Sequence, residues 1–192
     1  DGHVADVVLV VARAAEGLGL FRVEGAAPGL RRTALPALDL TRKLSRLDFS
    51  GAPGVRISAA DVSGALDRVL ALAVGALCAE QVGGAQRCLE AATEYARTRL
   101  QFGRPIGSYQ AIKHKCADML MRVEAARSAS YYAACTADER SADLPIAASL
   151  AKAYCSDTYF QCAADSMQIH GGIGFTWEYD LHLYFKRAKA CD

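Results

Sequence analysis

The sequence lacks the features that mark several classes of protein. No apolar run approaches the ~20 residues of a membrane span. The net charge is only +1, with both signs mixed along the chain, so no nucleic-acid-binding tract is indicated. The seven cysteines are an odd number with no C-x-x-C pair, which gives no sign of a zinc site. Most lie at apolar positions of helical patterns, and we interpret them as reduced core thiols of a cytoplasmic protein.

Two further absences concern the start of the chain and its histidines. Residues 1–6 are neither an initiator methionine with its leader nor a signal peptide, so we expect the chain to begin in mid-domain. The four histidines are scattered, and none has a serine or cysteine nucleophile signature beside it. With 52% apolar and 22% charged residues, the chain has what it needs to build a core.

The first part of the chain, residues 4–58, has the pattern of short strands. A buried strand is predicted at Val7–Ala12 and a second at Leu18–Val23, joined by a hairpin turn. A weaker strand lies within residues 38–49, and another follows the turn at Pro53. This is too little sheet to close a barrel or pack two layers alone, so we expect a partial antiparallel β-domain over residues 1–58.

From Asp61 onward, apolar residues recur at the three- and four-residue steps of amphipathic helices. Short breaks between long helices favour antiparallel neighbours, so residues 59–192 are predicted to form an up-down four-helix bundle. Asp61 or Ser63 is expected to cap the first helix. The predicted fold is therefore mainly α, with the partial β-domain preceding the bundle. The expected helices run from Asp61 to about Gln101, about Tyr109 to Asp138, about Ile146 to Ile169 and about Glu178 to Lys189.

The break between the first two helices, residues 99–110, is the first candidate site. Gly103 and Pro105 end the first helix, and Ser108 is expected to cap the second. Arg99 would then lie at one helix end beside an open helix N-terminus, an arrangement that can hold an anion. The alternative is a plain helix–helix turn with a solvated arginine.

The glycine-rich end of the third helix is the second candidate site. Gly171, Gly172 and Gly174 permit positive φ and close backbone approach, and Gln168 precedes them. A backbone surface without side chains can touch a flat ring or a diphosphate. The alternative is a helix cap of the Schellman type, which needs only one glycine.

Both sites carry sequence blocks that resemble those of the acyl-CoA dehydrogenase family. Tyr95–Ile106 resembles the block Y-A-x-x-R-x-x-F-G-x-P-I, and Gln168–Phe175 resembles the signature Q-I-x-G-G-x-G-F. The resemblance extends from about Gly2 to Ala190 and is closest to actinobacterial members. It implies the second half of that family's middle β-domain followed by its C-terminal helical domain, with the N-terminal part missing.

The resemblance also implies a cofactor, FAD, and an acyl-CoA substrate. In the family the two blocks grip the adenosine diphosphate half of FAD across a subunit interface, so Arg99 would pair with the pyrophosphate. His170, inside the signature, would lie near the FAD. The residues implied for the adenine and ribose side are Gln101, Phe102, Ile106, Tyr109 and Ile112, and those implied for the other side are Gln168, Gly171 and Gly172.

No catalytic base is assigned in this chain. The family reaction, α,β-dehydrogenation of an acyl-CoA thioester, needs a carboxylate to remove the α-proton. Its common base follows the last helix, beyond residue 192, whereas the alternative base aligns with Ala73 and a substrate-facing arginine aligns with Val74. Glu80 lies ~10 Å further along the helix and is a poor substitute. Glu178 is expected to be structural.

Three functions remain open from the sequence. The chain resembles members that work in sterol side-chain breakdown as mixed tetramers, in which only one subunit type carries the base, and the alanine at position 73 fits the partner without it. It also fits an ordinary homotetrameric enzyme of fatty acid oxidation whose base lies beyond Asp192. The third possibility is a non-catalytic helical scaffold that has lost flavin, against which Arg99 and the Gly171-Gly172 pair argue.

Overall fold

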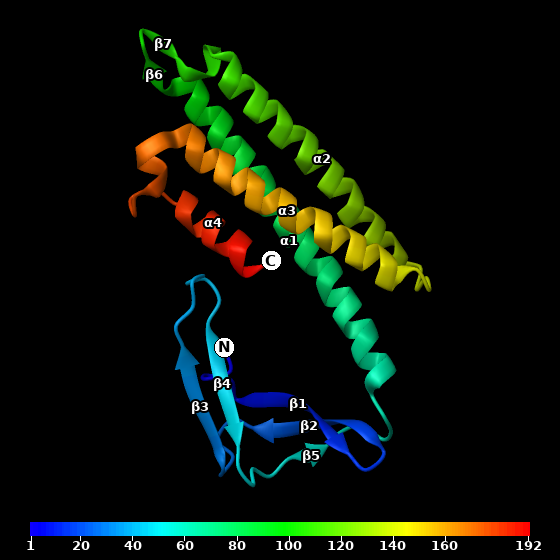
Figure 1. Cartoon of the computed structure of the whole chain (residues 1–192). Helices are drawn as coiled ribbons and strands as arrows, with labels where there is room; N and C mark the ends of the chain where they lie inside the picture. The colour runs from blue at the N-terminus through cyan, green and yellow to red at the C-terminus, as the bar shows by residue number, and fades with distance from the viewer. The chain divides into compact units, whose positions relative to one another are not determined.

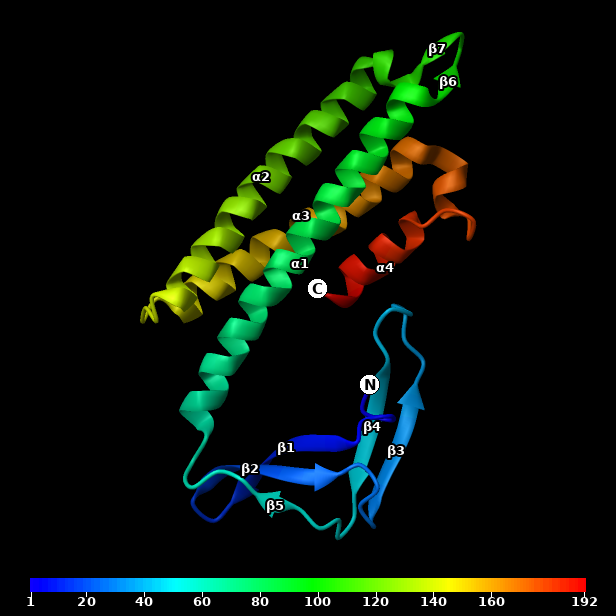
Figure 2. The ribbon, with the colours of Figure 1, turned by 180° about the vertical axis from the view of Figure 1, so that it is seen from behind.

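The computed structural model describes all 192 residues, which divide into two compact units, residues 1–69 and 70–192. The first unit holds two small antiparallel sheets and the start of the longest helix, and the second holds the remaining helices (Figures 1 and 2). The predicted fold class, a partial β-domain followed by a bundle of four helices, is confirmed.

The first unit contains five short strands. β1 (Val7–Ala14) and β2 (Gly17–Glu24) form the predicted hairpin and pair along their whole length, and β5 (Val55–Arg56) pairs with the other edge of β2. β3 (Leu30–Leu35) and β4 (Leu44–Phe49) form a separate two-stranded sheet. All pairs are antiparallel, as expected for strands joined by short connections.

Two features of this unit differ from the sequence prediction. β1 is not a buried strand, since Leu9 is 61% exposed and Val7 and Val11 are also exposed. Successive side chains of a strand point to opposite faces, so a strand that is apolar throughout still exposes one face of a single-layer sheet. The sequence pattern also does not predict β3, because Arg31 and Arg32 interrupt any alternation of apolar residues there.

The four helices of the bundle follow the predicted order, with shifts of a few residues at their ends. The Asp61 carboxylate accepts hydrogen bonds from the Ser63 backbone N–H, at 3.1 Å, and from its hydroxyl group. The first helix ends before Gln101 because that residue enters a hairpin, and the last begins after Glu178 because turns precede it. Their bounds are α1 (Ser63–Thr98), α2 (Gln110–Asp138), α3 (Leu144–His170) and α4 (Leu181–Ala190).

The core of the bundle is built largely from small side chains and thiols on the facing sides of the helices. Met119 and Val123 of α2 meet Tyr159 and Cys162 of α3 in a cluster to which α1 adds two alanines and α4 adds Ala188. A second cluster pairs Cys78 of α1 with alanines of α2 and α3. Five of the seven cysteines are buried, and all seven are free thiols, as the apolar helical positions indicated.

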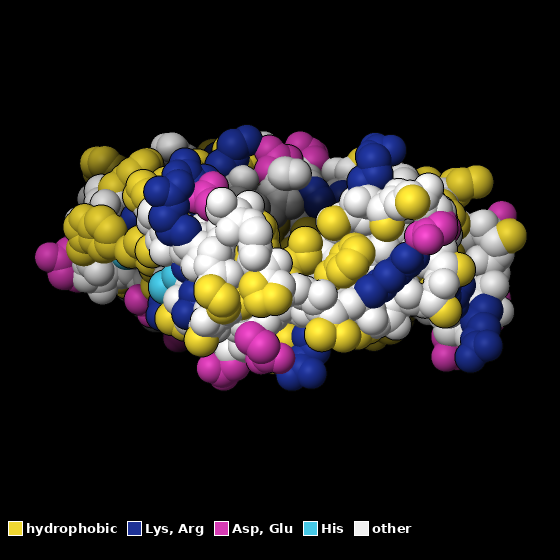
Figure 3. All heavy atoms as spheres, turned by 90° about the horizontal axis from the view of Figure 1, so that it is seen from below, with side chains coloured by type: hydrophobic (Ala, Val, Ile, Leu, Met, Phe, Trp, Pro, Cys, Tyr) yellow, Lys and Arg dark blue, Asp and Glu magenta, His cyan; other side chains and the backbone are white.

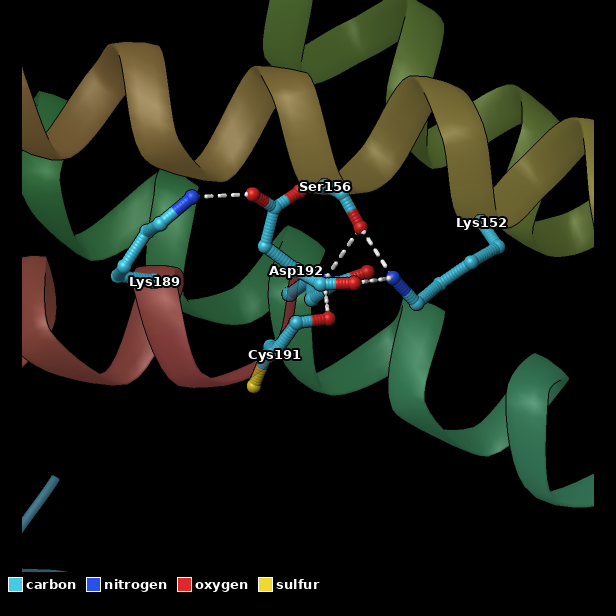
Figure 4. A network of polar contacts seen from close by, with 6 residues as sticks. Lys152, Ser156, Lys189, Cys191 and Asp192 are labelled. Carbon is cyan, nitrogen blue, oxygen red and sulfur yellow. Dashed lines mark hydrogen bonds and ion pairs between the residues drawn. The ribbon is translucent and has the colours of Figure 1, made fainter. Parts of the chain in front are cut away.

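A buried polar cluster also connects three of the helices (Figure 4). The fully buried Gln81 of α1 donates through Nε2 to Ser156 Oγ of α3, at 2.9 Å, and to the Cys191 carbonyl after α4, at 3.3 Å. Lys152 Nζ donates to the same Ser156 hydroxyl at 2.7 Å and to the Asp192 carbonyl at 3.0 Å. Because buried polar groups need hydrogen-bond partners, these contacts fix the end of α4 against α1 and α3.

We expect Gly84→Ala to destabilise the bundle. A Cβ at this position would lie 2.4 Å from Cζ of the buried Tyr159 ring, so the ring must shift. Overpacking of this kind costs about 1–3 kcal/mol, which lowers the Tm of a chain of this size by several degrees. The neighbouring Gly83→Ala is the matched control, since a Cβ there meets nothing within 4 Å. Thermal unfolding followed by circular dichroism should show a loss for Gly84→Ala alone, and equal Tm values would contradict this packing.

The surface carries charges of both signs between apolar side chains, as Figure 3 shows for one face. No helix is both long enough and apolar enough to cross a membrane. No group of three or more His, Cys, Asp or Glu side chains is arranged to hold a metal ion.

Candidate functional site

The break after α1 folds as a tight hairpin. β6 (Leu100–Gln101) and β7 (Arg104–Pro105) are antiparallel and are joined by the two residues Phe102 and Gly103. Both have positive φ, 53° and 79°, as a two-residue hairpin of this kind requires. Glycine adopts this conformation readily, whereas phenylalanine does so at a cost, and its ring is 91% exposed. The hairpin therefore holds Phe102 in a costly backbone conformation and leaves its ring exposed.

Arg99 lies between the end of α1 and this hairpin. Its backbone N–H donates to the Tyr95 carbonyl at 2.8 Å, and its carbonyl accepts from Ile106 at 2.8 Å, so its backbone is fixed on both sides. Its side chain is exposed, and no hydrogen bond or ion pair within the chain engages the guanidinium group. The predicted position of Arg99 at a helix end is therefore present, and its charge is available to an anion.

Tyr109 holds the other side of the hairpin. Its hydroxyl donates to the Gln101 carbonyl at 3.3 Å, and the Arg104 guanidinium lies 4.1 Å from the centre of its ring. This cation–π contact covers one face of the ring. Tyr109 thus supports the hairpin directly, while the side chains of Gln101 and Phe102 remain exposed.

The expected cap of the second helix is wrong. Ser108 belongs to η1, a 3₁₀ turn over Ile106–Ser108, and Tyr109 occupies the N-cap position of α2 without a side-chain hydrogen bond. The Ser108 hydroxyl group is buried and has no partner. The extra 3₁₀ turn between Pro105 and α2 moves Ser108 away from the cap position, and the first turn of α2 stays uncapped.

Two of the predicted lining residues serve the core. Ile106 and Ile112 are half-buried and pack against the cluster that contains Met119 and Leu89. Their side chains connect the hairpin and the start of α2 to the bundle. Any contact of these two residues with a ligand therefore uses only the part of each side chain that remains exposed.

The glycine turn at the end of α3 has the open backbone surface that the sequence indicates. Gly171 caps α3 with φ 67° and ψ −142°, a conformation essentially restricted to glycine. Gly172 is the second residue of η2 (Gly171–Phe175), and a Cβ there would meet nothing within 4 Å. Gly174 differs, because a Cβ there would lie 2.9 Å from the Met167 carbonyl. The backbone conformation thus requires glycine at 171 and the packing requires it at 174, whereas neither requires it at 172.

The structure brings the two sites together at one end of the bundle. α1 and α3 both end there, and Figure 1 shows the β6–β7 hairpin and the turn after α3 at the same end. The contact is direct, since the rings of Tyr95 in α1 and His170 in α3 stack with centroids 4.2 Å apart. Tyr95 lies one helical turn before Arg99, and His170 directly precedes the exposed Gly171 and Gly172, so the helix ends that carry the two candidate sites are in contact.

A groove of about 370 Å³ beside this region was not predicted from the sequence. It is lined by α1, by the segment before α4 and by the first turn of α4, and it contains the carboxylates of Glu94, Glu178 and Asp180 against the single arginine Arg87. Three carboxylates against one arginine repel a diphosphate, so we expect any anion to bind near Arg99 and not in this groove. The groove depends on packing between segments 80 or more positions apart, so no local pattern signals it.

The two residues aligned with catalytic positions of the family carry no group that can remove a proton. Ala73 is exposed and carries no titratable group, and Val74 packs against the second core cluster. Arg187 of α4 holds Glu80, with Nε and Nη2 each 2.6 Å from Oε1, which ties this carboxylate to the bundle. The pKa of Glu178 is lowered by hydrogen bonds from its own backbone and from Thr176, in keeping with a structural role in the turn.

Comparison with known proteins matches this chain to one family. The model of the acyl-CoA dehydrogenase C-terminal domain matches residues 65–192. Acyl-CoA dehydrogenase IpdE2 of Mycobacterium tuberculosis is 39% identical to the chain over 194 residues, which cover 98% of this chain and 52% of that protein. The chain thus spans about half the length of this curated relative.

Solved structures agree with the match. The chain resembles a chain of the ChsE4-ChsE5 complex from Mycobacterium tuberculosis with a TM-score of 0.88 at 33% identity, covering 99% of this chain and 51% of that one. It resembles the structure of PigA with FAD and proline with a TM-score of 0.91 at 28% identity, covering 99% and 52%. In each case the similarity includes both units of the chain.

Proposed function

Because the chain belongs to the acyl-CoA dehydrogenase family, we propose that it takes part in the FAD-dependent α,β-dehydrogenation of an acyl-CoA thioester. Its own contribution is a grip on the adenosine diphosphate half of FAD. The observation that carries this proposal is the Tyr95–His170 contact, which joins the end of α1 just before Arg99 to the end of α3 just before the Gly171-Gly172 turn. When bound, FAD supplies the hydride acceptor of the reaction, and the protein supplies its binding and orientation.

The residues at this surface suit the two chemical parts of adenosine diphosphate. The planar guanidinium of Arg99 is free and matches two oxygens of a pyrophosphate. The exposed Phe102 ring offers a stacking surface for adenine, and Gln101 and Gln168 offer exposed amide groups. Gly172, where the chain itself has room for a side chain, leaves the backbone open to close approach by a ligand.

We further propose that this grip serves an FAD held by a related subunit in a homo- or hetero-oligomer, as a tetramer in the cytoplasm. ChsE4-ChsE5 of Mycobacterium tuberculosis is a complex of two different chains, and the similarity of the present chain to it supports a mixed assembly. Ala73 and the Arg187-bound Glu80 support the version in which the partner subunit provides the base. Sterol side chains or fatty acyl chains are the proposed substrates.

The flavin content of the intact protein tests the proposal directly. The purified protein, alone or with a related subunit, should show flavin absorbance or take up added FAD. A colourless protein that takes up no FAD in either form would overturn the proposal and favour a structural scaffold.

Gly172→Ala should weaken FAD binding without affecting stability. The added methyl group meets no atom of the chain, so the Tm should stay that of the parent protein. If the backbone at Gly172 contacts the cofactor, the methyl group forces it away at a cost of about 1–3 kcal/mol, or roughly fivefold or more in affinity. FAD titration followed by flavin fluorescence measures the effect, with Gly83→Ala as the control variant. Unchanged affinity would show that Gly172 does not contact FAD.

A further inference from the structure

Three aromatic rings from three segments form a stack beside the glycine turn. The His170 ring, only 4% exposed, lies between Tyr95 of α1, at 4.2 Å and an interplanar angle of 24°, and Tyr179 of the segment before α4, at 5.0 Å and 52°. The stack therefore joins the end of α1, the end of α3 and the start of the last helical segment. His170 is the last residue of α3 and directly precedes Gly171, so its ring lies at the start of the glycine turn.

The hydrogen bonds of His170 define its protonation state. Nδ1 lies 2.7 Å from the Ser166 carbonyl, which can only accept, so Nδ1 carries the proton. Nε2 is buried without a partner, and in the cation it would become a second N–H donor with no acceptor. Burial accordingly lowers the pKa of His170 below the usual value of 6.5, against the weaker, opposite effect of the Ser166 hydrogen bond.

The surroundings of His170 contain no compensating charge. The titratable groups that face its ring are Tyr95 from α1 and Tyr179 from the segment before α4, and Ser166 faces it from its own helix. No carboxylate or cation acts on its titration. The Ser166 hydrogen bond alone favours the imidazolium ion, and the effect of burial outweighs it.

We propose that neutral His170 is a positioning residue that, through the Tyr95–His170–Tyr179 stack, holds the glycine turn against the end of α1 that carries Arg99. The inference rests on the proposed function, because the stack would keep Arg99 and the Gly171-Gly172 turn at a fixed position relative to each other for FAD binding. Tyr95 is one helical turn from Arg99 and His170 is next to Gly171, so a loss of stacking separates Arg99 and the turn directly.

The pH dependence of FAD binding separates this role from simple packing. Because the folded pKa is lowered, the stack is fully stable above the ordinary histidine pKa of 6.5 and loses stability as the pH falls below it. The intact wild-type protein should therefore bind FAD severalfold more weakly at about pH 5.5 than at about pH 7.5. His170→Phe keeps a ring but cannot titrate, so its affinity should be retained and should lose this pH dependence. His170→Ala should bind about tenfold more weakly throughout.

The control is His182→Phe, which removes a histidine that meets Trp177 edge to face outside this cluster. It should keep the wild-type pH profile. Loss of the profile in His182→Phe, persistence of the profile in His170→Phe, or wild-type affinity in His170→Ala would each overturn the proposal.

Hydrogen exchange gives a readout that does not depend on FAD. The backbone amides of residues 171–174 should exchange faster in His170→Ala than in the wild type, and His170→Phe should restore their protection. If no form of the protein binds FAD, the proposed function fails, and this experiment alone decides whether the stack holds the turn. Equal exchange in His170→Ala and the wild type would show that it does not.

Discussion

Replacing Arg99 with alanine should reduce the affinity for FAD by about tenfold to a hundredfold. A hydrogen bond to a charged group contributes about 1.5–3 kcal/mol, and the Arg99 guanidinium has no partner in the chain that would remain unpaired after truncation. The loss should therefore appear almost entirely in binding, with little change in Tm. Flavin release followed by fluorescence, together with thermal unfolding, measures both quantities in the intact protein.

Arg97→Ala provides the matched control for this substitution. Arg97 is an exposed arginine in the last turn of α1, two residues from Arg99 and hence about 200° around the helix. Its removal changes the net charge by the same amount but leaves the proposed pyrophosphate contact intact. If both variants retain FAD as tightly as the parent protein, Arg99 is a solvated surface residue. Equal losses in both would indicate a general electrostatic attraction in place of a specific contact.

The bundle could be predicted from the sequence because its periodic pattern is long. α1, α2 and α3 each repeat apolar residues over seven or more turns, so errors are confined to the ends, where hairpins and 3₁₀ turns compete with the last helical turn. The strands of residues 1–69 were harder to predict from the sequence, since β3 has no alternating pattern. The exposed face of β1 also cannot be distinguished from a buried one when every residue is apolar.

The parts of the candidate site that depend on local backbone conformation could be predicted from the sequence. Gly171 was identified because a glycine-only conformation ends α3, and Arg99 because a break follows α1. The roles of Ile106 and Ile112 in the core, the Arg104–Tyr109 contact and the His170 stack all depend on which helix packs against which. One sequence contains no local pattern for such contacts. The assignment of the nine lining residues to FAD remains a prediction that the proposed variants test.

The position of the base has the largest expected effect on activity. Ala73 offers no group to remove the α-proton, and the Glu80 carboxylate, although 41% of its side chain is exposed, is held in an ion pair by the largely buried Arg187. Substitution of Glu80 should therefore affect the stability of the α1–α4 contact more than catalysis. The reaction accordingly needs a carboxylate from outside residues 1–192, either on the same protein or on a partner subunit.

If the partner subunit provides the base, the intact protein expressed alone should oxidise acyl-CoA thioesters roughly 10²–10⁴-fold more slowly than the mixed oligomer, the usual cost of losing a general base. Ala73→Glu should then recover part of this rate once FAD is bound. Recovery should be incomplete because Val74 provides no positive charge to orient the thioester.

Ala79→Glu adds the same carboxylate on another face of α1 and should recover nothing. Flavin reduction by a panel of acyl-CoA thioesters, with and without a co-expressed related subunit, measures each rate. Full activity of the lone wild-type protein would show that the same protein carries a base outside residues 1–192. The proposal that it is a partner subunit without a base would then be wrong.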